Sequence, residues 1–138
     1  MKIVIKEDGC VPTRGTERSA GMDLYCTETV EIPRKSTAKI RTKVHIEIPE
    51  GHFGLLCPRS SIGKKGLGLA NTVGIIDSDY RGEIICLIKN HNAHSETIVA
   101  QDRVAQLVIV PYFCPKIEVV EQLTETERGD GGFGSTGA

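Results

Sequence analysis

The chain has 138 residues, a length that fits one domain with a real hydrophobic core but not two. Its 17 basic and 18 acidic residues give a formal net charge of -1, and no basic block argues for binding to a nucleic-acid polymer. No apolar run reaches membrane-spanning length and the N-terminus lacks a signal-peptide pattern. We therefore expect no membrane contact and a cytoplasmic protein, with the nucleus left open for a eukaryotic or viral source.

The five cysteines are an odd number, lie far apart and form no CxxC pair. This spacing indicates reduced, mostly buried small hydrophobic residues rather than disulfides or metal ligands. They are Cys10, Cys26, Cys57, Cys86 and Cys114.

Apolar and polar residues alternate along most of the chain, and helical periodicity is scarce. Many short strands separated by turns are therefore expected, with one helix candidate of a turn or two near residues 60–65. The expected strands are 2–6, 23–26, 29–32, 37–41, 44–48, 53–57, 73–76, 83–88, 96–99, 103–110 and 116–120. The pattern predicts an all-β sandwich, jelly roll or barrel.

The first polar position of interest is Asp23, which lies between Met22 and Leu24. Alternation points its side chain away from the face that these two neighbours share. It is either a solvated acid at a strand edge or, because hard cations prefer oxygen ligands, an acid that holds a hydrated divalent cation.

The segment CPRSSIGKKG at 57–66 combines hydroxyls, an arginine and glycines. Pro58 ends a strand, and Ser60 or Ser61 can cap a short helical turn. Such a turn, together with Arg59, suits a phosphate, although the residue order is not that of a Walker loop. An ordinary capped polar turn is the alternative.

Two β-branched runs, 73–76 and 83–88, flank a polar loop that carries Asp77, Tyr80 and Arg81. We expect a hairpin whose strands hold this loop in place, as rigid scaffolds hold catalytic loops. The alternative is an ordinary polar turn.

Two amide side chains are also candidates for a site. Asn71 offers a donor and an acceptor, which match the edge of a pyrimidine, or it bonds to its own turn. Gln106 is the one polar interruption of the apolar run 103–110, which predicts a strand covered on both faces. Its amide must be hydrogen-bonded or lie at a site.

The composition changes after residue 120, where a polar stretch leads into RGDGGFGSTG. Glycines cannot build a core, and ordering them carries a high entropic cost. The end is either a frayed terminus or an arm that orders only over a ligand, since glycines admit an anion and Phe133 offers a face to a planar base. We expect a β domain at 1–120 and a flexible C-terminal arm at 121–138.

These five stretches, in this order, resemble the five motifs of the trimeric dUTP pyrophosphatases (dUTPases). The matching segments are AGMDL, PRSSIGKKG, NTVGIIDSDYRG, RVAQLVIVP and RGDGGFGSTG, which extend from residue 20 to 137. The resemblance implies a jelly-roll-like distorted β-barrel of the β-clip type, in a homotrimer whose active sites are shared between subunits. It also implies Mg²⁺-dependent hydrolysis of dUTP to dUMP and pyrophosphate, which keeps uracil out of DNA and supplies dUMP for dTMP synthesis.

The resemblance further implies a role for individual residues. Asp77 would be the general base that activates the attacking water, Asp23 would hold the waters of the metal, and Tyr80 would pack against the deoxyribose. The residues that would surround the base are Asn71, Gly74, Ile75, Ile76 and Ile85. Those that would contact the phosphates or the water are Arg59, Ser60, Ser61 and Gln106. The arm would supply Arg128, Ser135 and Thr136 to the terminal phosphates, and Phe133 with Gly134 to the base.

Ser61 stands where glycine is frequent in that family, and Asp130 adds a negative charge beside the expected phosphate grip. Two alternative functions are compatible with parts of the sequence. dCTP deaminases are similar in fold and in the Arg-Ser-Ser stretch, but they normally lack the GGFGSTG arm and the IDSDY loop. A non-enzymatic β-sandwich that binds a partner through the same surface is permitted by alternation alone.

Overall fold

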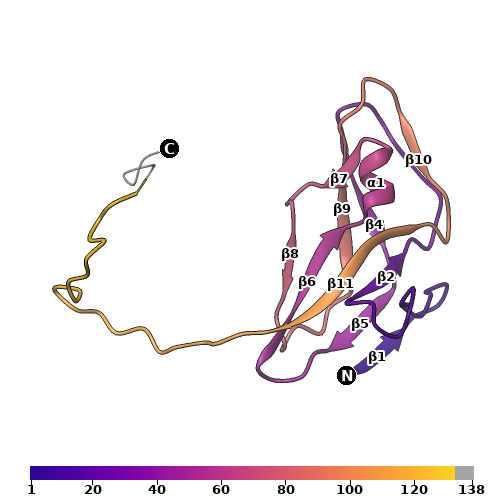
Figure 1. The fold of residues 1–138 in the computed structure, drawn as a ribbon. Helices are drawn as coiled ribbons and strands as arrows, with labels where there is room; N and C mark the ends of the chain where they lie inside the picture. The colour runs from indigo at the N-terminus through magenta and orange to yellow at the C-terminus, as the bar shows by residue number, and fades with distance from the viewer. Residues whose placement is uncertain (133–138) are drawn as a thin grey trace.

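The computed structural model of the chain describes residues 1–132, which contain eleven β-strands and one short helix (Figure 1). In chain order the elements are β1 (Lys2–Ile5), β2 (Gly21–Tyr25), β3 (Val30–Ile32), β4 (Thr37–Arg41), β5 (Val44–Glu47), β6 (His52–Pro58), α1 (Ser60–Lys64), β7 (Leu67–Leu69), β8 (Gly74–Ile76), β9 (Ile85–Asn90), β10 (Glu96–Ile98) and β11 (Arg103–Pro111). In this part of the chain no helix has the length and apolar character that crossing a membrane requires. The cytoplasmic location stays a prediction.

Two antiparallel sheets form the body of the molecule. One has the strand order β2-β11-β6-β8 and the other the order β4-β9-β7. Two-stranded sheets, β1-β5 and β10-β3, complete the body toward its two ends (Figure 1). This arrangement, with a single short helix, confirms the predicted all-β, jelly-roll-like fold.

The core lies between the sheets and explains the alternation in the sequence. Leu24 and Leu107 from the first sheet and Ile40 and Ile88 from the second are fully buried. On β2 the burial alternates residue by residue, so that Asp23 points away from the core, as predicted. The polar residues that alternate with these apolar ones therefore lie on the outer faces of the sheets, where the candidate site is found.

Most strand predictions agree with the structure to within one or two residues, and β4 agrees at both ends. The short strand β7 was missed because its sequence, Leu-Gly-Leu, is brief and interrupted by glycine.

The predicted hairpin across the Asp77 loop is wrong. β8 pairs with β6, whereas β9 pairs with β4 and β7, so the two runs that flank the loop belong to different sheets. An apolar run indicates that a strand exists but not which strand it pairs with. The loop therefore crosses from one sheet to the other.

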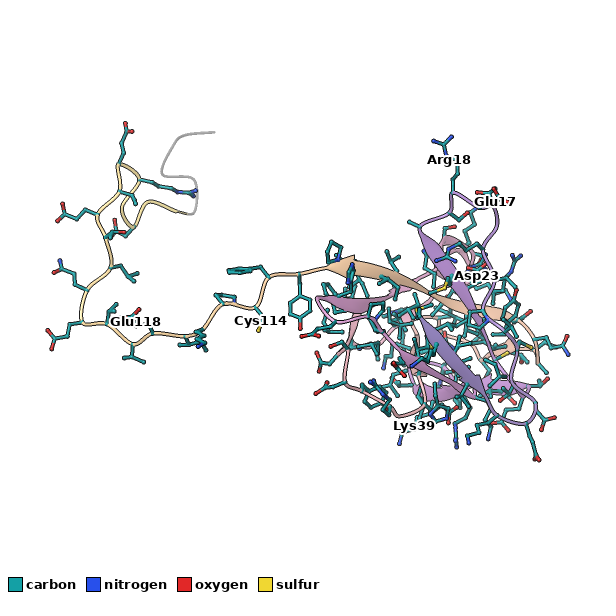
Figure 2. All side chains as sticks on the ribbon, turned by 90° about the horizontal axis from the view of Figure 1, so that it is seen from below. Glu17, Arg18, Asp23, Lys39, Cys114 and Glu118 are labelled. Atoms are coloured by element: carbon teal, nitrogen blue, oxygen red, sulfur yellow. The ribbon has the colours of Figure 1, made fainter. Side chains whose placement is uncertain are left out.

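The predicted strand at 116–120 is also wrong. The last strand ends at Pro111, and residues 112–132 extend away from the β body without regular structure (Figures 1 and 2). Ile117 and Val119 alternate as in a strand but are 95% and 94% exposed, because no sheet within residues 1–132 faces them. The division between a domain at 1–120 and an arm at 121–138 stays a prediction.

The strand β11 is not covered on both faces within the single chain. Val104, Ala105 and Leu107 are buried, whereas Val108 and Val110 are half-buried. The expectation of two covered faces is therefore not met by the isolated chain.

The five cysteines are free, as predicted, but they are less buried than expected. Cys26 and Cys86 lie in the core, and burial raises the pKa of the Cys86 thiol to about 12. Cys10 and Cys57 are half-buried, and Cys114 is exposed on the segment that leaves the body (Figure 2).

Substitution Leu107→Ala tests the packing between the sheets. Because Leu107 is fully buried on the central strand, we expect the free energy of unfolding to fall by about 3 kcal/mol. The measurement is urea unfolding, with Val11→Ala as the control because Val11 is 64% exposed. Equal stability of the two variants would contradict the assigned core.

Candidate active site

Three strands bring the first, second and fourth motif stretches together. Gln106 on β11 lies opposite Asp23 on β2 and opposite Cys57 on β6. The Gln106 amide donates a hydrogen bond to the carbonyl oxygen of Pro58, 3.1 Å away. This register, which the sequence does not reveal, places three distant segments around one spot.

Asp23 is paired with two arginines. Its Oδ1 lies 2.7 Å from Nε of Arg59 and its Oδ2 lies 3.4 Å from Nη1 of Arg103. The Asp23 side chain is only 13% exposed, which rules out the reading of a solvated acid at a strand edge. Two guanidinium groups against one carboxylate leave a local excess of positive charge, which favours an anion.

A cleft of about 420 Å³ opens beside this cluster. Its lining residues are Gly15, Ser19, Ala20, Gly21, Asp23, Arg59, Ser60, Arg103 and Gln106. Gly21 packs closely on Gln106, since a Cβ there would overlap the amide oxygen in its present position. The cleft combines guanidinium, hydroxyl and amide donors, which is the chemistry of a phosphate site.

The helix α1 presents its two serines differently from the prediction. The residue before the helix is Arg59, which makes no side-chain cap, so neither Ser60 nor Ser61 caps the turn. Arg59 instead donates a hydrogen bond to Oγ of Ser61 at 3.1 Å, and Ile62 anchors the helix in the core. The hydroxyl of Ser60 remains at the cleft.

The first cleft has one carboxylate in its lining, Asp23, and therefore no protein-built metal cage. Among residues 1–132 no group of three or more His, Cys, Asp or Glu side chains could hold a metal. Mg²⁺ keeps several waters and is commonly bound through one or two carboxylates together with substrate phosphates. Asp23 is the carboxylate of this cleft that could take part in such a site, although here both of its oxygens are paired with Arg59 and Arg103.

A second cavity, of about 200 Å³, lies where the Asp77 loop crosses between the sheets. Its lining residues are Ile75, Ile76, Asp77, Tyr80, Glu83, Ile84 and Ile85. Ile75 and Ile85 are 59% and 38% exposed, which is unusual for isoleucine and leaves apolar surface facing the cavity. Apolar walls with one phenol and two carboxylates, Asp77 and Glu83, suit a flat ligand with a reactive group.

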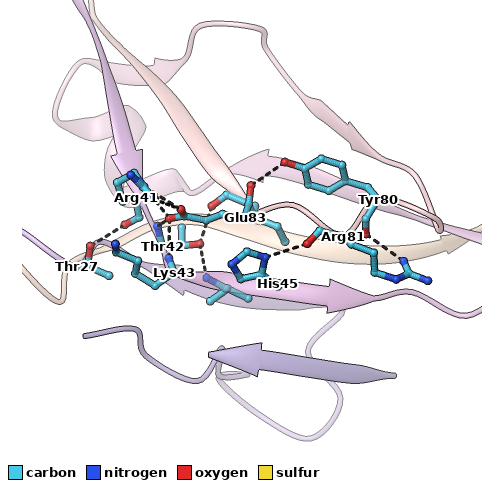
Figure 3. Close-up of polar contacts among 10 residues, drawn as sticks. Thr27, Arg41, Thr42, Lys43, His45, Tyr80, Arg81 and Glu83 are labelled. Carbon is cyan, nitrogen blue, oxygen red and sulfur yellow. Dashed lines mark hydrogen bonds and ion pairs between the residues drawn. The ribbon is translucent and has the colours of Figure 1, made fainter. Parts of the chain in front are cut away.

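The loop itself fixes Asp77 and Tyr80. Asp77 follows directly on β8, and its carbonyl oxygen accepts a hydrogen bond from the amide of Tyr80 at 3.1 Å. The Tyr80 hydroxyl donates to the carbonyl oxygen of Glu83 at 3.0 Å (Figure 3). Gly82 leaves room for this position of the Tyr80 side chain, since a Cβ there would overlap the Tyr80 hydroxyl.

β8 is the outer strand of its sheet, so one of its two edges offers backbone N–H and C=O groups to a ligand. Gly74 packs closely on Leu56, where an added Cβ would lie 3.1 Å from the Leu56 Cβ. The same Cβ would lie 3.6 Å from Nδ2 of Asn71, which places the Asn71 amide at the start of β8. Within residues 1–132 that amide has no hydrogen-bond partner, so the bonded-turn alternative does not hold.

Most of the predicted site residues within 1–132 line one of two separate pockets, whereas Ser61, Asn71 and Gly74 line neither of these two. Asp23, Arg59, Ser60 and Gln106 line the first cleft and Ile75, Ile76, Asp77, Tyr80 and Ile85 line the second, and the two linings share no residue. Arg128 lies in the extended segment, where it bonds to the Gly131 carbonyl at 2.9 Å. Phe133, Gly134, Ser135 and Thr136 lie outside the described residues.

Two residues at the clefts were missed from the sequence. Arg103 lies at the start of β11, and its contact with Asp23 depends on a register that alternation does not give. Glu83 lines the second cavity, and hydrogen bonds from Arg41 lower the pKa of its carboxyl. The available signal for Glu83 was an acidic residue immediately before a strongly apolar strand.

Solved structures of similar shape include two phage proteins. The chain superposes on the Staphylococcus bacteriophage 80alpha dUTPase with dUpNHpp with a TM-score of 0.90 and 31% identity, covering 99% of this chain and 98% of that one. It superposes on a point mutant of the dUTPase from Staphylococcus aureus phage phi11, which coordinates a structural Mg(II) ion, with a TM-score of 0.83 and 29% identity, covering 90% and 98%.

Sequence comparison gives the same result. The deoxyuridine 5'-triphosphate nucleotidohydrolase of Escherichia phage T5 is 41% identical over 146 residues, which cover 100% of this chain and 99% of the phage protein. The family model described as dUTPase matches residues 7–137. The chain therefore belongs to the dUTPase family.

Proposed function

We propose that the chain hydrolyses dUTP to dUMP and pyrophosphate, the activity for which its relatives are named. The observation that carries the proposal is Asp77, an exposed carboxylate at the end of an edge strand and at the wall of a small apolar cavity. A planar base fits between apolar side chains, and a carboxylate beside it can activate water. In a cell this activity would keep uracil out of DNA and supply dUMP for dTMP synthesis.

In this proposal Asp77 is the general base. Water is a poor nucleophile, so the Asp77 carboxylate takes one of its protons as the oxygen forms a bond to the α-phosphorus. The bond from that phosphorus to the bridging oxygen breaks in line with the attack, and pyrophosphate leaves. The exposed position of Asp77 supports this role, because both water and substrate can reach its carboxylate.

In this proposal, residues of the first cleft and of the C-terminal arm bind the negatively charged phosphates of the substrate. Arg59, Ser60 and Gln106 would bind phosphate oxygens or the water, with Ser61 held on Arg59 beside them. From the arm, Arg128, Ser135 and Thr136 would grip the terminal phosphates. Asp23 would hold the waters of a Mg²⁺ ion, and that ion when bound would neutralise charge that develops on the phosphate oxygens.

Selection of the base and the sugar falls to the second cavity. The edge of β8 at Gly74, Ile75 and Ile76, together with Ile85, would offer backbone groups to uracil, and the unpaired Asn71 amide a donor and an acceptor. The Tyr80 ring would form a wall where a ribose 2′-hydroxyl would otherwise sit. Phe133 and Gly134 would cover the base from the arm.

We further propose that the active site is shared between the subunits of a homotrimer. We call the first cleft, beside Asp23, the phosphate cleft and the second cavity, beside Asp77, the base cavity. In one chain their linings share no residue, so each provides only half of what a nucleoside triphosphate needs. The segment 112–132 leaves the body with its apolar side chains exposed, which suits contact with another copy (Figure 2).

The activity is tested by pyrophosphate release from dUTP, UTP, dCTP and dTTP, each with and without Mg²⁺. We expect release from dUTP with Mg²⁺ and little from the other three, because the cavity selects the base and the Tyr80 wall selects the sugar. Ammonia released from dCTP would instead identify a deaminase. No turnover of any of the four would favour a binding module.

Substitution Asp77→Asn is expected to lower kcat by about a hundredfold or more while dUTP binding is retained, since a general base contributes on that scale. The matched control is Asp79→Asn, in the same exposed loop but outside the cavity lining. Near-normal turnover by the Asp77 variant would remove this residue from the mechanism.

Deletion of residues 128–138 is expected to leave the fold intact and to abolish most of the catalysis. The deleted segment is glycine-rich, and residues 112–132 make no strand with the body, so little of the core depends on it. Thermal unfolding and dUTP turnover are measured on the same sample. A large drop in the unfolding temperature would assign the arm a structural role instead.

A further inference from the structure

We propose that Glu83, held by Arg41, is a positioning residue that fixes the width of the base cavity and thereby the affinity for the substrate. This inference deepens the proposed function and rests on it. The Asp77 loop crosses between two sheets, which is why such a residue is needed. β8 is hydrogen-bonded to β6, whereas β9 is hydrogen-bonded to β4 and β7. Strand pairing thus fixes each wall of the cavity but not the gap between the walls.

The Glu83 carboxylate is fastened to the turn between β4 and β5. Its Oε1 accepts hydrogen bonds from the amides of Thr42 and Lys43 at 3.1 and 2.9 Å, and Arg41 binds both carboxylate oxygens, with Nε 3.0 Å from Oε1 and 2.8 Å from Oε2 (Figure 3). A second guanidinium nitrogen of Arg41 also contacts Oε2. The Glu83 side chain is 9% exposed, so these bonds are largely shielded from water.

The turn that receives Glu83 is held by several hydrogen bonds. Lys43 has a φ of +59°, and two successive amides in such a turn form a small concavity that binds an anion. The buried Thr42 hydroxyl donates to the carbonyl oxygen of Ile84 at 2.6 Å, and the Ile84 amide donates to the carbonyl oxygen of Val44 at 2.9 Å. The Glu83–Ile84 segment is therefore tied to this turn through both its side chain and its backbone.

The same segment is one wall of the base cavity. Glu83, Ile84 and Ile85 line it together with Ile75 and Ile76 from β8. The backbone carbonyl of Glu83 also accepts the hydrogen bond from the Tyr80 hydroxyl, so a displacement of Glu83 moves the Tyr80 ring as well. Asp77, in contrast, follows directly on β8 and depends on the ladder to β6.

This division of support separates binding from chemistry. Loosening the Arg41–Glu83 pair should widen the gap and weaken contact with the base while leaving the Asp77 carboxylate at the end of β8. A pair with a purely structural role would lower stability without a selective effect on substrate affinity.

The test compares Arg41→Gln and Glu83→Gln with wild type in full-length protein, using steady-state dUTP hydrolysis and calorimetric binding of the analogue dUpNHpp. The matched control is Glu47→Gln, which removes a glutamate from the exposed Lys2–Glu47 pair. We expect KM and the analogue Kd to rise about tenfold in Arg41→Gln and in Glu83→Gln, because a tenfold change corresponds to the loss of about one charge-assisted hydrogen bond. We expect kcat to stay within about twofold of wild type. The control should match wild type.

Thermal unfolding accompanies each assay. If Glu83→Gln fails to fold, Arg41→Gln decides the question, because the Arg41 side chain is about half exposed and the two amide bonds to Glu83 remain without it. The inference is overturned if Arg41→Gln or Glu83→Gln folds and keeps the KM and Kd of wild type, or if kcat falls while KM stays constant. It is also overturned if KM rises equally in the control Glu47→Gln. Wild-type protein that leaves dUTP intact overturns the proposed function together with the inference.

Discussion

The passage of the Asp77 loop from one sheet to another is the constraint on which the rest of the site depends. If the two flanking strands had paired, backbone hydrogen bonds would have closed the space between them. Because β8 pairs with β6 and β9 pairs with β4 and β7, a cavity remains, and within residues 1–132 the outer edge of β8 has no partner strand. Asp77 and Tyr80 are placed at that cavity by the crossing itself.

The same constraint gives a role to the Arg41–Glu83 ion pair, in which Glu83 is 9% exposed and Arg41 about half exposed, beside the proposed binding site. A gap between two sheets has no ladder to set its width, and the turn between β4 and β5 supplies the missing support through Glu83. At the other cleft the register of β11 performs the equivalent task. It sets Gln106 against Asp23, and Asp23 in turn orients Arg59 and Arg103.

Much of this fold could be predicted from alternation, because burial on one face of a sheet repeats every second residue. Strands such as Thr37–Arg41 and the outward direction of Asp23 were found in this way. The pairing between strands could not be predicted, because an apolar run does not indicate which strand lies beside it. For that reason the hairpin prediction failed, and the contact between Asp23 and Arg103 was missed.

The candidate site shows the same limit. Its residues were named from motif stretches, but their separation into two clefts is a three-dimensional fact that spacing does not contain. The expected strand at 116–120 failed for a related reason: Ile117 and Val119 have the right periodicity, but no sheet within residues 1–132 faces them. Alternation predicts a strand only where a facing surface exists.

The central claim is that one complete site requires more than one chain. Its most direct test is complementation between Asp77→Asn, which disables the base cavity, and Arg59→Ala, which disables the phosphate cleft, with the two chains co-expressed under different affinity tags and purified through both. We predict that the mixed oligomers hydrolyse dUTP well above the rate of either variant alone, because some sites then combine an intact Asp77 with an intact Arg59. Mixed oligomers no more active than the separate variants would contradict the account.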